Sequence, residues 1–131
     1  MTVGILGLGL IGGSMARVYA LEGHTVLACE KDEQMLRFAM LAGAVHDVLD
    51  ENNIPSCDLI LLAIYPGGSA KWLEEHAHLI SRDALVLDCC GTKREICSRS
   101  LYMIIISKVC CQSSIAFLYG ADCRRRSTKI F

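Results

Sequence analysis

The sequence lacks several patterns that mark whole classes of protein. Its eight cysteines include no C-x-x-C pair, so the usual zinc-ligand spacing is missing and we expect no metal site. No H-E-x-x-H segment occurs either, which argues against a zinc-protease helix. The apolar N-terminus has no basic segment before it, so no secretion signal is predicted. We therefore expect a cytoplasmic protein with reduced thiols.

Acidic side chains are scarce near the C-terminus, and the two signs of charge are unevenly distributed along the chain. Residues 1–98 hold 13 acidic and 7 basic side chains, a net charge of −6, whereas residues 99–131 hold one acid and six basic side chains, a net charge of +5. The two segments differ so much in composition that we predict a domain over 1–98 and a divergent tail over 99–131. A disordered or out-of-frame segment would account for this tail.

No uninterrupted apolar run is long enough for a membrane span. The segment 101–120 is broken near its middle by Lys108 and three polar residues, and a charge at that depth costs about 2.5 to 3.5 kcal/mol. Three adjacent arginines, 124–126, are expected to be solvated. We expect neither a membrane nor a nucleic acid as a partner.

Glycine, in contrast, is concentrated near the N-terminus, in TVGILGLGLIGGS at 2–14. Val3, Ile5 and Leu6 predict a buried strand, and Gly7 the tight turn after it. Gly9 removes a side chain that would keep a pyrophosphate from the backbone, and Gly12 allows the next helix to pack closely. The backbone N–H groups at that helix start, around Leu10 and Ile11, would face the phosphates.

The context of this motif supports a dinucleotide site. A helix is predicted after it, with Ile11, Met15 and Val18 on its buried side. A second strand, 25–29, then leads to Glu30, which lies 18 residues after Gly12, close to the expected separation of about 20 for the acid that binds the adenosine ribose. A glycine-rich turn that binds nothing, with Glu30 an ordinary solvated carboxylate, is the alternative.

Residues 30 and 31 bear on the choice of cofactor. A carboxylate at position 30 favours the free 2′-hydroxyl of NAD and repels the 2′-phosphate of NADP, while Lys31 partly offsets that repulsion. NAD is therefore predicted over NADP. A second helix should follow, opened by residues 31–33 and ended by Gly43, with Met35, Leu36, Ala39 and Met40 as its apolar set.

The rest of the first 98 residues continues the alternation of strands and helices. Residues 44–56 predict a short strand and a polar loop, and the apolar run 58–64 predicts a strand buried on both faces. A loop at 65–68 would reach the carboxyl edge of the sheet, where Ile64, Tyr65 and Pro66 could contact the cofactor, although a plain Pro-Gly turn has the same composition.

A third helix is predicted from an N-cap at Ser69 through Leu73, Ala77 and Ile80. Two histidines on it, at 76 and 78, are expected at the surface. The strand 84–88 should then end beside Thr92 and Lys93, which could contact a substrate, although a bare strand edge would have the same sequence. The predicted fold is α/β, a doubly wound and mostly parallel sheet.

The order of these motifs resembles the prephenate dehydrogenase family, which includes arogenate dehydrogenases. The resemblance rests on VGILGLGLIGGSMA at 3–16, DLILLAIYP at 58–66 and LDCCGTKREI at 87–96. Gly12, Gly13 and Ser14 match the double glycine and serine that follow the family's fingerprint. In the family's Asp-x-Gly-Ser-x-Lys turn, Asp88 and Lys93 are kept, whereas Gly91 stands at the serine position.

The resemblance implies a Rossmann-like domain that is truncated, because it ends near residue 98. The family's histidine segment and its helical dimerisation domain have no counterpart here, so the catalytic group is unknown. The implied activity is NAD-dependent oxidative decarboxylation of prephenate, or of arogenate, in tyrosine biosynthesis. A catalytically inactive NAD-binding module is the main alternative, and another dehydrogenase, such as a hydroxyacid dehydrogenase or an imine reductase, is a third.

Overall fold

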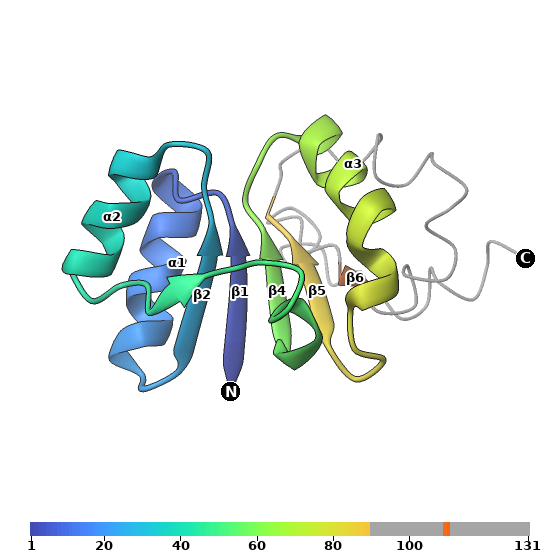
Figure 1. Ribbon diagram of the computed structural model, residues 1–131, viewed down its shortest axis with the longest axis horizontal. Helices are drawn as coiled ribbons and strands as arrows, with labels where there is room; N and C mark the ends of the chain where they lie inside the picture. The colour runs from blue at the N-terminus through green and yellow to red at the C-terminus, as the bar shows by residue number, and fades with distance from the viewer. Residues whose placement is uncertain (90–108, 111–131) are drawn as a thin grey trace, which may run out of the picture.

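The centre of the molecule is a parallel β-sheet. The computed structural model describes residues 1–89 and 109–110. Its strand order is β3-β2-β1-β4-β5-β6, and every neighbouring pair is parallel (Figure 1). The strands are β1 (Thr2–Leu6), β2 (Thr25–Cys29), β3 (Asp47–Val48), β4 (Leu59–Leu62), β5 (Leu85–Asp88) and β6 (Val109–Cys110). The predicted α/β fold with a doubly wound sheet is confirmed.

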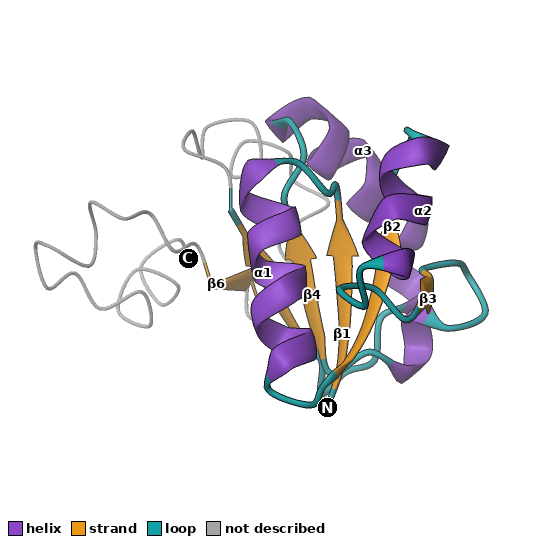
Figure 2. Cartoon of the chain, turned by 90° about the vertical axis from the view of Figure 1, so that its left-hand side faces the viewer, coloured by secondary structure: helices purple, strands orange, loops and turns teal. Residues whose placement is uncertain are grey.

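Helices cover both faces of this sheet. Helices α1 (Leu10–Leu21) and α2 (Glu33–Leu41) pack on one face, and α3 (Pro66–His76) packs on the other, together with the short 3-10 turns Ile54–Ser56 and Ala77–Leu79 (Figure 2). The change of face follows from the strand order. The chain moves from β1 outward through β2 and β3, then returns to β4 on the other side of β1, and right-handed crossovers place the two sets of helices on opposite faces.

Alternate side chains of the strands build one core on each face. On the α1 and α2 side, Ile5, Val26 and Leu61 are fully buried or nearly so. On the α3 side, Leu62 packs with Leu73 of α3, and both have no exposed surface. Burial on both sides explains the continuous apolar runs of β1 and β4, because a parallel strand between two helical layers has no solvated face.

The buried side of α1 differs from the prediction. Ile11 and Val18 were expected to face the core, but each is 53% exposed. The buried residues of the helix are Gly12 and Ala16, with Met15 packed beside them. The reason is size: at Gly12, α1 lies so close to the end of β1 that no larger side chain fits between them, and a stripe of small residues does not stand out in an apolar pattern.

The start of α3 also differs from the prediction. Ser69 was expected to cap the helix, but α3 begins at Pro66 and Ser69 lies inside it with no exposed surface. Proline suits the first helical position because the N–H that it lacks would have no intrahelical partner there. The helix is shorter than predicted at its other end, since it stops at His76 and a 3-10 turn follows. His76 is half-buried and stacks on Trp72, with ring centroids 4.7 Å apart, whereas His78 is exposed as expected.

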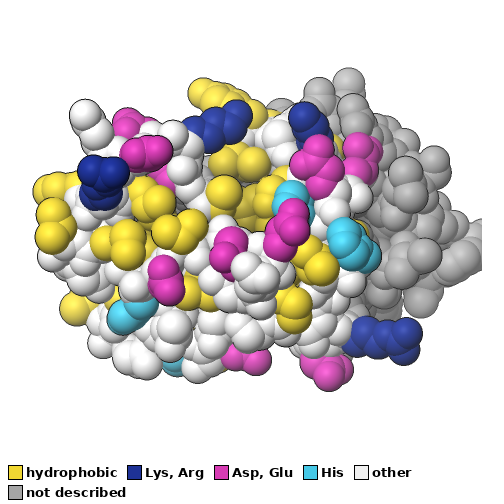
Figure 3. All heavy atoms as spheres, viewed as in Figure 1, with side chains coloured by type: hydrophobic (Ala, Val, Ile, Leu, Met, Phe, Trp, Pro, Cys, Tyr) yellow, Lys and Arg dark blue, Asp and Glu magenta, His cyan; other side chains and the backbone are white. Residues whose placement is uncertain are grey.

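Helix α2 forms where it was predicted. The Asp32 carboxylate caps it by accepting hydrogen bonds from the N–H groups of Gln34 and Met35 at 2.9 and 3.3 Å, and Gly43 ends it with φ +71°. Its outer side is apolar, since Phe38 is 73% and Leu41 90% exposed, and hydrophobic side chains are visible at this end of the molecule in Figure 3.

The segment between α2 and β4 contains the predicted short strand, β3, and then a turn. His46 adds a contact that the sequence did not indicate. Its side-chain Nδ1 accepts a hydrogen bond from the Val26 backbone N–H at 3.0 Å, and its backbone N–H donates to the Val26 carbonyl at 2.8 Å. This pair extends the bonding between β2 and the outermost strand. Among the residues that the structure describes, no helix has the length and apolar character that a membrane crossing requires.

Candidate dinucleotide site

The glycine-rich turn between β1 and α1 forms a tight cradle. Gly7 has φ +85°, and a Cβ there would lie 2.6 Å from the Ile64 side chain. A Cβ at Gly12 would overlap the carbonyl oxygen of Gly7, so the third glycine permits the close approach of helix and strand. Gly9 is different, because a Cβ on it would have nothing within 4 Å. The first and third glycines are therefore required by the fold, and the second leaves open space above the turn.

The first turn of α1 presents unpaired backbone donors to that space. Within the described part of the chain, no side chain caps this helix, and the first intrahelical bond runs from the Gly13 N–H to the Gly9 carbonyl at 2.8 Å. The N–H groups of Leu10, Ile11 and Gly12 precede that bond and have no intrahelical acceptor. The predicted residues Leu10 and Ile11 are 90% and 53% exposed. Such a helix start is suited to a phosphate group.

Glu30 lies directly beside the turn, at the end of β2. Its Oε2 accepts a hydrogen bond from the Leu8 N–H at 2.7 Å, and its Oε1 accepts from the N–H groups of Lys31 and Asp32 at 2.7 and 3.1 Å. Desolvation raises the pKa of Glu30, but the hydrogen bonds from Leu8, Asp32 and Lys31 outweigh it and leave that pKa below its ordinary value. The carboxylate is therefore ionised at neutral pH.

An open groove of about 500 Å³ runs from the turn along α1 toward α2. Two of its lining residues, Gly9 and Leu10, are among the predicted cofactor contacts. Arg17 is not among them, and its guanidinium is the one cationic group among the groove's lining residues. The groove is lined by Leu8, Gly9, Leu10, Gly13, Ser14, Arg17 and Met35. The place of Arg17 beside the turn could have been predicted from helical spacing, because positions 10, 14 and 17 share one face of the helix.

The predicted contacts after β4 lie on the other side of the turn. Strand β4 pairs with β1 up to Leu62, and Ile64 packs so closely on Gly7 that it brings this segment against the cradle. Tyr65 is 89% exposed, and the half-buried Pro66 begins α3. The expected loop at 65–68 is therefore only Tyr65 followed by the first helical turn, yet it lies at the carboxyl edge as predicted.

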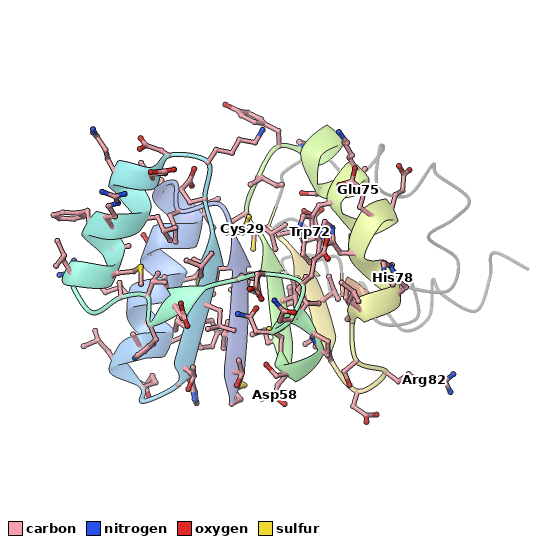
Figure 4. The ribbon with its side chains drawn as sticks, viewed as in Figure 1. Cys29, Asp58, Trp72, Glu75, His78 and Arg82 are labelled. Atoms are coloured by element: carbon pink, nitrogen blue, oxygen red, sulfur yellow. The ribbon has the colours of Figure 1, made fainter. Side chains whose placement is uncertain are left out.

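The thiols of Cys29, Cys57 and Cys89 are free, and they differ in exposure. Cys29 is exposed at the carboxyl end of β2 (Figure 4), where its carbonyl accepts a hydrogen bond from the Gly7 N–H at 2.9 Å. Cys57 is buried and Cys89 half-buried. No group of three metal-binding side chains occurs among the described residues. Thr92 and Lys93, the predicted substrate contacts, lie outside them.

Comparison with known proteins identifies the type of domain. Residues 2–91 match the protein family described as NADP oxidoreductase, coenzyme F420-dependent. The chain belongs to this family. The chain is therefore an NAD(P)-binding oxidoreductase domain with a Rossmann-like fold. No curated protein sequence matches the chain significantly.

Solved structures with the same fold include several dehydrogenases and reductases. Arogenate dehydrogenase from Synechocystis is 25% identical over 70% of this chain and 34% of its own, with a TM-score of 0.65. Prephenate dehydrogenase from Aquifex aeolicus, solved with hydroxyphenyl propionate and NAD+, is 18% identical over 83% of this chain and 40% of its own, with a TM-score of 0.70. An imine reductase from Bacillus cereus is 16% identical over 82% of this chain and 37% of its own, with a TM-score of 0.64.

This chain corresponds to only part of each of these proteins. The chain spans between 34% and 40% of the length of the three proteins. At 18% and 16% identity, the prephenate dehydrogenase and the imine reductase share the fold with it. A member of the NADP oxidoreductase family with this cradle is therefore a dinucleotide-binding domain.

Proposed function

We propose that this chain binds NAD and forms the cofactor domain of a dehydrogenase that acts on prephenate or arogenate. The observation that carries the cofactor assignment is the contrast between the glycines. A Cβ is excluded at Gly7 and Gly12 by the fold itself, whereas at Gly9 only a ligand would exclude it. A fold has no need of glycine at such an open position, but a pyrophosphate lying against the backbone does.

The residues present fit the parts of a dinucleotide. The N–H groups of Leu10, Ile11 and Gly12 would bind the pyrophosphate, and Glu30 would accept a hydrogen bond from an adenosine ribose hydroxyl. Tyr65 and Ile64 would border the ligand on the β4 side. The ionised Glu30 carboxylate would repel a 2′-phosphate, which favours NAD, and Lys31 would weaken that repulsion. When bound, NAD supplies the hydride acceptor.

The substrate assignment rests on the resemblance of three motifs to prephenate dehydrogenases. The similarity to arogenate dehydrogenase, at 25% identity, is consistent with it. Thr92 and Lys93 would contribute a hydroxyl and a cation to an anionic substrate, from the segment after β5. Within this proposal, residues 1–98 form the cofactor domain and 99–131 a tail of divergent composition, which contributes β6 beside β5. The group that accepts the substrate's hydroxyl proton is not assigned to any residue.

Thermal unfolding with and without dinucleotide tests the cofactor assignment. A ligand at one hundred times its dissociation constant should stabilise a native site by about 2.7 kcal/mol. We expect NAD to raise the melting temperature of the full chain more than NADP does at the same concentration. A cooperative transition that neither dinucleotide moves would contradict the proposal.

An inactive NAD-binding module is the second candidate. It is favoured by Gly91, which stands where the family's Asp-x-Gly-Ser-x-Lys turn has its serine, so that one polar substrate contact would be lost. Formation of NADH from NAD with prephenate, with arogenate and with a 3-hydroxyacid would separate the possibilities. Turnover with either of the first two supports the dehydrogenase, turnover with the third alone would point to a different substrate, and binding of NAD without any turnover supports the inactive module.

A further inference from the structure

The Glu30 carboxylate accepts hydrogen bonds from three backbone N–H groups of the protein itself. An ionised carboxylate offers about four lone-pair positions. Three are engaged by backbone N–H groups, namely those of Lys31 and Asp32 on Oε1 and that of Leu8 on Oε2. The bond to Leu8 joins positions 22 residues apart in the sequence, and it connects the end of β2 to the middle of the glycine-rich turn.

We infer that Glu30 is a positioning residue for the phosphate-binding turn, and that it holds Leu8 in place before any ligand binds while keeping one lone pair for a single ribose hydroxyl. This inference rests on the proposed dinucleotide function. It gives the same side chain a second role: by holding the backbone of Leu8, Glu30 would strengthen binding of the pyrophosphate as well as of the ribose.

The geometry explains why this turn needs such support. Leu8 itself is buried, with 6% of its surface exposed, whereas Gly9 and Leu10 beside it are exposed. The Gly7 N–H is bound to the Cys29 carbonyl at 2.9 Å, so two successive amides of the turn are attached to the end of β2. Without the carboxylate, the Leu8 N–H would lose its acceptor in a half-buried position, and the spacing of the donors at the start of α1 would be less well defined.

Amide hydrogen exchange of the ligand-free full chain tests the inference without reference to NAD binding. In Glu30→Asp the side chain is one methylene shorter. We expect it still to accept from the nearby Asp32 N–H, as aspartate does in Asx turns, and to fall short of the Leu8 N–H, which Glu30 contacts at 2.7 Å. We expect Leu8 exchange to accelerate roughly tenfold or more, because bonds to charged groups are among the stronger ones, with Asp32 exchange little changed. Glu33→Gln, an exposed carboxylate on α2, is the matched control.

A ligand comparison provides the second readout. Binding of ADP and of 2′,3′-dideoxy-ADP, which lacks both ribose hydroxyls, is measured by calorimetry in wild type and in Glu30→Ala. If Glu30 acted on the ribose alone, the variant would bind the dideoxy ligand equally well or better, because a negative charge near the phosphates has been removed. We expect it to bind that ligand severalfold more weakly, since the turn is no longer held.

The outcomes separate the two proposals. Unchanged Leu8 exchange in both Glu30 variants, or undiminished binding of the dideoxy ligand to Glu30→Ala, would overturn the positioning role. If wild-type protein binds no dinucleotide although Leu8 exchange responds to the variants, the proposed function fails and the positioning of the turn stands.

Discussion

Gly12 lies so close to Gly7 that a methyl group on the third glycine of the turn would overlap the carbonyl oxygen of the first. The obstacle is backbone rather than a flexible side chain, so relief requires α1 to move away from β1. Gly9 is the opposite case, with no atom near the position of a Cβ. Its φ of −63° is also accessible to alanine.

We therefore expect alanine at position 12 to reduce stability and alanine at position 9 to reduce NAD binding. Gly12→Ala should lower the free energy of unfolding by about 1 to 3 kcal/mol or more through overpacking. Gly9→Ala should change it by less than about 0.5 kcal/mol, as at unconstrained surface positions, yet weaken NAD binding because its methyl group occupies the space of the pyrophosphate. Urea unfolding and calorimetry measure the two effects. Equal loss of stability in both variants would contradict the assignment of separate roles.

Glu30 predicts a specific acid dependence of stability. Its pKa is lowered in the folded chain, so its contribution to stability is present above the pKa of the unfolded state, about 4.3, and is lost as the pH falls through the lower folded value. Glu30→Gln should therefore lose less stability than wild type between about pH 5 and pH 3. Urea midpoints across this range check it, with Glu33→Gln as the control. Parallel curves for wild type and Glu30→Gln would refute the prediction.

Cys29 offers a chemical probe of the site. Its thiol is exposed, but desolvation and the charge of Glu30 raise its pKa, so alkylation should be slow at neutral pH and faster as the pH rises. Bound NAD should protect it, because Cys29 borders the glycine-rich turn. Burial raises the pKa of Cys57 to about 11, which makes it an internal control that stays unmodified with or without NAD. Peptide mapping after maleimide treatment reports both thiols, and an unprotected Cys29 at saturating NAD would argue against the proposed site.

The core on the α3 side predicts a large effect of one truncation. Leu73 has no exposed surface, and Leu73→Ala should lower the free energy of unfolding by about 2 to 5 kcal/mol. Leu41→Ala is the matched control, because Leu41 is 90% exposed on α2 and its loss should cost less than about 0.5 kcal/mol. Chemical unfolding of the two variants gives the comparison. Similar costs for both would mean that α3 does not pack on the sheet as described.

The strands were largely predictable from sequence, for a physical reason. A parallel strand covered on both faces is an uninterrupted apolar run, so β2 at Thr25–Cys29 was predicted to the residue and β4 and β5 nearly so. The glycine-rich turn and Glu30 could be placed because their spacing is set by one strand, one helix and one further strand. These features depend on local sequence.

The missed features depend on neighbours in space. The buried stripe of α1 is made of Gly12 and Ala16, and small residues are favoured only because β1 lies close behind them. Pro66 and the two glycines after it resemble a turn by composition, yet they open α3. The bond between Glu30 and Leu8 uses a backbone N–H, and no residue type at position 8 could have indicated it.

The two helices that begin at the carboxyl edge have a joint electrostatic consequence. Helix α1 follows β1 and α3 follows β4, these strands are neighbours, and the helices lie on opposite faces of the sheet. Each helix carries a macrodipole equivalent to roughly half a positive charge at its first turn, so two such partial charges converge on the crevice above β1 and β4. In a domain whose charged side chains are mostly acidic, the backbone thus supplies an attraction for anions that no change of side-chain ionisation can remove.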